Sequence, residues 1–226
     1  MEVATATRQG QHKELAVFVV LYALSSFNAE MLRRSVGSDH ALQTSHSLLA
    51  AATRLISDHI HPLIMAIGAV WLLTMAMAIA QGRRLPRWSF DGPGLWFCTR
   101  LMIEFLIING LIFQPSLVQP GVLLGQIVIY LPFFVITWGW IFHRLDWVQT
   151  QQPGSVVQLS DIDNESAISR FDYFHSTINT LINKGKPTIT GVSRTGRITV
   201  LIFNGMLLSL YAVAFARILQ LTKATL

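Results

Sequence analysis

Two ionisable side chains lie inside a stretch of sequence that is otherwise almost free of charge. Arg100 and Glu104 are four residues apart, and this spacing places both on one face of a helix. An ionisable pair inside an apolar helix is a candidate for ion permeation or partner docking, because a charge is costly in a bilayer. Mutual neutralisation also explains the pair, with Arg100 near the predicted helix end and able to snorkel. We expect structural pairing rather than permeation.

Acidic and histidine residues form two further groups, and neither completes a metal site. Asp161, Asp163 and Glu165 are spaced by single residues, but the glycine and the distant bidentate glutamate of an EF-hand are missing. A solvated turn is the preferred interpretation. His143 and His175 fall on one predicted membrane face, without a carboxylate partner nearby. We therefore expect no metal and no cofactor.

The sequence gives no support for catalysis. Gly185-Lys186-Pro187-Thr188 lacks the upstream glycine of a phosphate loop, and proline removes a backbone donor that such a loop needs. No Ser/His/Asp or paired-carboxylate motif is present on a plausible scaffold. We predict that the protein is not an enzyme.

The composition is that of an integral membrane protein. The chain has 226 residues, of which 52% are hydrophobic and only 13% are charged, and its mean hydropathy is +0.47. These values exclude an ordinary soluble domain. The net charge of +5 fits anionic lipid headgroups better than nucleic acid, since no basic run is interleaved with aromatic residues. Cys98 is the single cysteine, which excludes an intramolecular disulfide.

The apolar runs predict an all-α polytopic protein with about five transmembrane helices. The first run is short for a bilayer and needs snorkelling flanks or local thinning. The runs are Leu15–Phe27, Pro62–Ala80, Leu95–Phe113, Val122–Phe142 and Ile198–Leu219. We place four spans in an N-terminal membrane region, residues 1–143. Residues 144–226 hold a polar segment, a loop element and the last span, and the two regions form one structural unit.

Three segments connect these spans. Apolar residues recur near helical spacing over residues 41–60, which predicts an amphipathic helix at the interface or an extension of the next span. Arg83, Arg84 and Arg87 form a compact basic loop after the second span. Residues 149–170 are polar and are expected to lie outside the membrane.

The stretch from Phe171 to Leu221 combines a short aromatic-led segment, a polar Gly/Pro/Lys turn and a long apolar helix. It resembles the pore module of the potassium-channel superfamily. Tyr173-Phe174 ends eleven residues before Gly185, Thr177 and Thr180 lie in a threonine-rich run, and Gly196-Arg197 opens the last helix. The resemblance covers roughly the last quarter of the chain. It implies a pore helix, a re-entrant loop, an inner helix, a homotetramer and a bacterial inner membrane location.

The filter differs from the family pattern. Where the family has Thr-Val-Gly-Tyr-Gly-Asp, this chain has Leu-Ile-Asn-Lys-Gly-Lys. In a four-fold assembly the two lysines would form rings of positive charge, which repel cations and suit anions. We therefore reject potassium selectivity and expect either an anion-permeable or weakly selective pore, or a loop that does not conduct. The filter-like residues are Thr180, Leu181, Ile182, Asn183, Lys184, Gly185 and Lys186.

The last span carries Asn204-Gly205 in its first half, where a helix can bend or approach a neighbour closely. The membrane orientation is open, because the pore-loop reading puts the basic loop outside the cytoplasm and so conflicts with the positive-inside tendency. The expected partners are the lipid bilayer and copies of the chain, with a membrane protein partner as the alternative if the module is a non-conducting scaffold.

Overall fold

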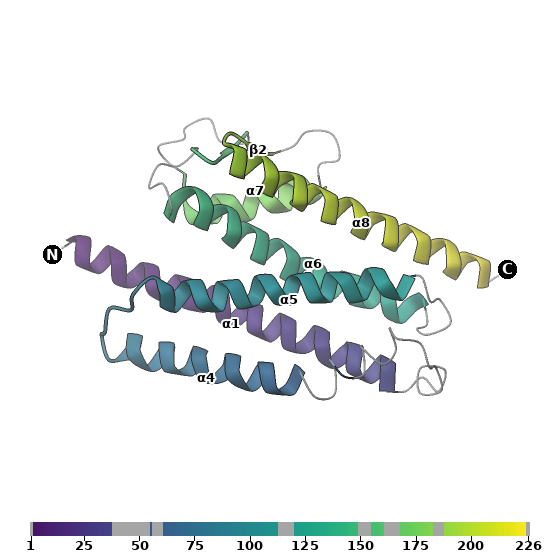
Figure 1. The fold of residues 1–226 in the computed structure, drawn as a ribbon, viewed down its shortest axis with the longest axis horizontal. Coiled ribbons are helices and arrows are strands. Elements are labelled where there is room, and N and C mark those ends of the chain that lie inside the picture. The colour runs from purple at the N-terminus through teal and green to yellow at the C-terminus, as the bar shows by residue number, and fades with distance from the viewer. Residues whose placement is uncertain are drawn as a thin grey trace. The chain divides into compact units, whose positions relative to one another are not determined.

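The computed structural model describes residues 2–37, 55, 61–112, 120–148, 155–160, 168–182 and 188–224. The described part is mostly helical (Figure 1), which confirms the predicted class. Its α-helices are α1 Glu2–Gly37, α4 His61–Ala80, α5 Trp88–Ile112, α6 Pro120–His143, α7 Arg170–Ile182 and α8 Arg194–Ala224. A π-helix, η2 Arg144–Val148, follows α6. Strands β1 Val157–Leu159 and β2 Ile189–Gly191 pair antiparallel, with Gln158 opposite Thr190.

Four helices in the described part of the chain are long and apolar enough to cross a membrane, as in an integral membrane protein. The candidate spans are Gly10–Met31, Pro62–Ala80, Leu124–Asp146 and Arg194–Gln220. The first has 22 residues, or roughly 33 Å at about 1.5 Å per residue. The expectation of a short first span was therefore wrong. Polar residues on both sides of Leu15–Phe27 continue the helix instead of ending it.

Helix α5 corresponds to the predicted third span but begins at Trp88, seven residues before Leu95. Pro93 lies inside the helix and costs one backbone hydrogen bond without ending it. With Asp91, Arg100 and Glu104 in its sequence, α5 is not among the four apolar candidates. That α5 crosses the bilayer remains a prediction.

The chain divides into two compact units: residues 1–133 with 217–226, and residues 134–216. In the first, α1 packs on α4 and α5. The Phe18 and Phe97 rings stack with centroids 5.6 Å apart, and the Tyr22 hydroxyl donates to the Met65 carbonyl at 3.1 Å. This three-helix packing holds together the long N-terminal helix and the α4–α5 hairpin.

The α4–α5 turn is fixed by a glycine. Gly82 has φ of 73°, a left-handed conformation that glycine adopts at little cost. The amide of Arg83 donates to the Ala78 carbonyl at 3.0 Å and that of Gly82 to Ile79 at 2.9 Å, which is the hydrogen-bond pattern of a Schellman cap. The turn therefore has a defined path that leads from α4 into α5.

Two predicted segments lie partly or wholly outside the described residues. Of the predicted amphipathic helix at residues 41–60, only Leu55 is described. The acidic run at 161–167 lies outside them too. Within the predicted polar segment 149–170, Val157 and Leu159 are buried on β1, so this segment is not wholly a solvent-exposed turn. The sequence analysis did not predict either strand.

Candidate functional site

Asp146 is the centre of the polar contacts in the second unit. It lies in η2, directly after α6, and its side chain is fully buried. The Tyr173 hydroxyl on α7 donates to Asp146 Oδ2 at 2.6 Å, and the Val156 amide donates to Oδ1 at 2.7 Å. One carboxylate therefore joins the end of α6, the start of the strand pair and the first half of α7. Burial and the bond to this carboxylate raise the pKa of Tyr173 above its ordinary value.

The strand pair is pressed against the start of α8 at two glycines. A Cβ on Gly196 would lie 1.9 Å from the Val156 carbonyl oxygen, and one on Gly191 would lie 2.3 Å from the Arg197 amide nitrogen. The amide of Val192 also donates to the Val156 carbonyl at 2.9 Å. These contacts explain the glycine at position 196, near the start of α8, because a side chain at that position would have no room.

Hydroxyl groups form the contact between α7 and Thr188, the residue directly before β2. The Thr188 hydroxyl donates to the Ser176 carbonyl at 2.7 Å and also bonds the Thr180 hydroxyl. Ser176, Thr177 and Thr188 are buried. The Thr177 hydroxyl donates to the Tyr173 carbonyl at 2.7 Å. Although α7 ends at Ile182, Thr188 therefore lies beside Ser176, in the middle of the same helix.

Aromatic packing holds α7 and α8 on the last part of α6. A Cβ on Gly139 would lie 2.5 Å from Phe174 Cδ1 and 3.1 Å from its Cα, so α7 lies directly on this glycine. The rings of Phe134 and Phe203 stack with centroids 5.5 Å apart. The ring of His143 lies edge-on to Tyr173, 5.6 Å between centroids. His143 is thus a packing residue beside the Asp146–Tyr173 bond.

The C-terminal end of α7 is bonded to the middle of α8. The Tyr211 hydroxyl donates to the Leu181 carbonyl, one of the carbonyls that the end of a helix leaves unsatisfied. Tyr211 lies seventeen residues after Arg194, roughly 25 Å along the helix at about 1.5 Å per residue. The end of α7 therefore lies beside the inner part of the candidate span Arg194–Gln220.

The predicted filter is only partly described. Thr180, Leu181 and Ile182 form the last turn of α7, and the Ile182 side chain is exposed. The other filter-like residues, Asn183, Lys184, Gly185 and Lys186, lie outside the described residues.

The predicted bend in the last span is not marked by a break. Helix α8 is continuous through Asn204 and Gly205, both exposed. A Cβ on Gly205 would meet no atom of the described residues within 4 Å. A close approach at Gly205 therefore remains a prediction that requires another molecule.

Arg100 and Glu104 do form an ion pair, in the first unit. Arg100 Nη2 lies 2.7 Å from Glu104 Oε1, and both side chains are buried. On α1, Asn28 Nδ2 donates to Glu104 Oε2 at 2.6 Å and the Ser25 hydroxyl donates to Oε1 at 3.2 Å. Arg100 lies in the middle of α5 with its side chain buried, and not near a helix end as expected from the sequence. The pair connects α1 to α5.

Sequence reasoning missed Asp146 and Gly139. An acidic residue directly after a long apolar run was a signal, but its partners lie ten and 27 residues away. Among the described residues, no group of three or more His, Cys, Asp or Glu side chains could hold a metal ion. Comparisons with protein-family models, curated proteins and solved structures found no match for this chain.

Proposed function

We propose that this chain is an ion-channel-like integral membrane protein that works as a four-fold oligomer, with the residues after α7 lining its axis. The observation that carries the proposal is the bond from the Tyr211 hydroxyl to the Leu181 carbonyl. It fixes the end of a short helix at a depth within the candidate span of α8. The proposal accordingly puts the residues that follow α7 at membrane depth.

The lengths of the elements support a loop that enters and leaves on one side. Helix α7 has 13 residues, about 20 Å at about 1.5 Å per residue, which is short of a hydrocarbon core of about 30 Å. Thr188, the first described residue after α7, lies back beside Ser176. Non-helical backbone at membrane depth is tolerated only where protein or a water-filled cavity surrounds it. An oligomer with a central pore provides both.

The loop sequence favours anions or weak selectivity. Four copies of Lys184 and Lys186 would place rings of ammonium groups along the axis, and such rings attract anions. The carbonyl ladder that selects potassium has no counterpart in Leu-Ile-Asn-Lys-Gly-Lys. We therefore propose that the pore prefers chloride-like anions to cations.

A second candidate function is a non-conducting membrane scaffold with the same packing. The hydroxyls of Thr177, Thr180 and Thr188 all bond within the chain. Hydroxyl groups that bond within the chain stabilise its packing. This packing does not require that an ion passes. In this alternative the loop binds a membrane partner.

The reversal potential under a salt gradient separates the two functions. The full chain is reconstituted in planar bilayers, and we expect an anion-selective reversal potential that Lys184→Glu moves toward cation selectivity. Lys13→Glu on α1, an exposed residue outside the module, is the matched control and should leave it unchanged. A conducting Lys184→Glu variant with an unaltered reversal potential removes Lys184 from the pore lining. Four assembled copies without current favour the scaffold.

A further inference from the structure

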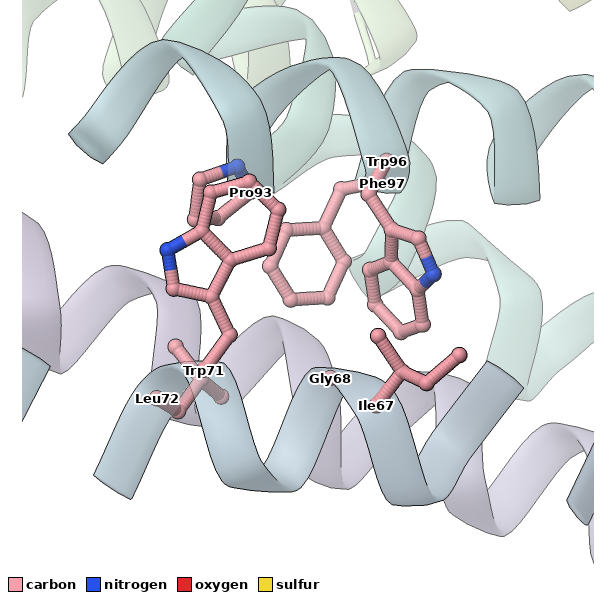
Figure 2. A pocket seen from close by; sticks show the side chains of 7 residues that line it. All are labelled: Ile67, Gly68, Trp71, Leu72, Pro93, Trp96 and Phe97. Atoms are coloured by element: carbon pink, nitrogen blue, oxygen red, sulfur yellow. The ribbon is translucent and has the colours of Figure 1, made fainter. Parts of the chain in front are cut away.

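The α4–α5 hairpin carries a small apolar groove that the proposed function does not use. Figure 2 shows Trp71 rising from α4 toward Pro93 on α5, and Trp96 descending from α5 toward Gly68, with Phe97 between the two indoles. The groove has a volume of about 50 Å³ and only apolar residues line it. That volume is far below the roughly 300–1,000 Å³ of a small-molecule pocket, so it suits a stretch of one hydrocarbon chain.

Close helix contacts keep the two indoles in place. A Cβ on Gly92 would lie 2.1 Å from the Trp71 ring, and one on Gly68 would lie 3.3 Å from the Trp96 ring. The six-membered ring of each tryptophan therefore lies close to a glycine of the opposite helix. The groove lies beside these two close contacts between α4 and α5.

The turn of the same hairpin is cationic and marks the membrane interface. The side chains of Arg83 and Arg84 are exposed, and the path of their backbone is set by the cap at Gly82. Gln11 on α1 donates to the Leu85 carbonyl at 3.2 Å, which holds the turn against the N-terminal part of α1. Trp88 follows with 69% of its surface exposed, as expected of a tryptophan at headgroup level.

The separation of the two features matches one lipid. Trp71 lies nine residues before the end of α4 and Pro93 five residues after the start of α5. The part of the groove at Trp71 and Pro93 is therefore roughly 8–14 Å along the helices from the turn, within the half-thickness of about 15 Å of one leaflet. Its far end at Ile67 is roughly 20 Å from the turn. If the phosphate of a lipid binds at the arginines, the acyl chain of the same lipid can reach the groove.

We propose that this hairpin binds one anionic phospholipid, with its phosphate at Arg83 and Arg84 and part of an acyl chain in the groove lined by Trp71, Trp96 and Phe97. Arginine guanidinium groups recognise phosphate by charge and paired hydrogen bonds. A zwitterionic phospholipid has the same acyl chains and also a phosphate, but its headgroup cation cancels the negative charge that would attract the arginines. A free phosphate offers the charge but nothing to the groove. Only an anionic lipid uses both features.

Quenching of tryptophan fluorescence by brominated lipid tests the site. The full chain is placed in phosphatidylcholine vesicles that contain a small, increasing mole fraction of phosphatidylglycerol brominated on its acyl chains. We expect a saturable quenching component at low mole fraction that Trp71→Phe/Trp96→Phe removes. Arg83→Gln/Arg84→Gln should shift its midpoint roughly thirtyfold to higher lipid. Arg194→Gln/Arg197→Gln removes two exposed arginines elsewhere and should not shift it.

Three results would overturn the lipid site. We expect no saturable component with brominated phosphatidylcholine; if it quenches equally, the hairpin does not select charge. Quenching that persists without Trp71 and Trp96 puts the lipid elsewhere. Displacement of the brominated lipid by excess inorganic phosphate would mean that the turn binds phosphate alone.

Discussion

The hydroxyl of Tyr173 donates a 2.6 Å hydrogen bond to the buried carboxylate of Asp146, across 27 residues of sequence. The same carboxylate accepts from the Val156 amide. Tyr173 is itself fully buried. The bond therefore joins the first half of α7 to the end of α6.

Removing the Tyr173 hydroxyl should destabilise the second unit. Tyr173→Phe leaves one buried carboxylate oxygen without this donor, at a cost of about 1–3 kcal/mol. Thermal unfolding of the purified protein in detergent measures the loss. Tyr22→Phe is the matched control, because its hydroxyl bonds a neutral carbonyl and is only partly buried. An equal effect of the two substitutions would contradict the role given to Asp146.

A methyl group at Gly196 should displace α8 from the strand pair. In Gly196→Ala the new Cβ meets the Val156 carbonyl oxygen, a backbone atom that cannot rotate away, so we expect a lower unfolding temperature. Gly205→Ala on the same helix meets open space and should be neutral or stabilising, by up to about 1 kcal/mol of helix propensity. If Gly196→Ala unfolds at the wild-type temperature, the described contact is wrong.

The Thr188 hydroxyl should be needed for the return of the chain alongside α7. Thr188→Val keeps the shape but removes the donor to the Ser176 carbonyl, and should cost about 1 kcal/mol. Thr188→Ser keeps the hydroxyl and should retain most of the stability. Hydrogen exchange at the amides of β2 provides the local measurement. Faster exchange in Thr188→Val but not in Thr188→Ser is the predicted result, and equal exchange in both would refute it.

Helix positions were predictable, whereas helix ends were not. Runs such as Pro62–Ala80 match α4 because about twenty apolar residues are needed to cross a bilayer. The ends of α1 and α5 were missed because the flanking polar residues also form helix. The Asp146 partners were missed for a different reason: no local pattern encodes a contact between residues 146 and 173.

The buried pair on α5 should tolerate double replacement better than single replacement. Glu104→Gln leaves Arg100 as an uncompensated buried charge, which typically costs about 3–5 kcal/mol. Replacing both with apolar residues, Arg100→Met/Glu104→Leu, should lose less, although Ser25 and Asn28 then lack their acceptor. A double-mutant cycle on the free energy of unfolding measures the coupling. A coupling energy near zero would show that the pair does not stabilise the α1–α5 contact.

An experimental structure of the full chain in lipid nanodiscs tests the central claim most directly. The proposed function predicts four copies, with Asn183 to Gly185 of each copy meeting on a common axis and α8 around it. A single copy, or a loop that faces lipid away from any axis, would contradict a pore. The second candidate function, a scaffold that binds a membrane partner, would then explain the packing around Asp146.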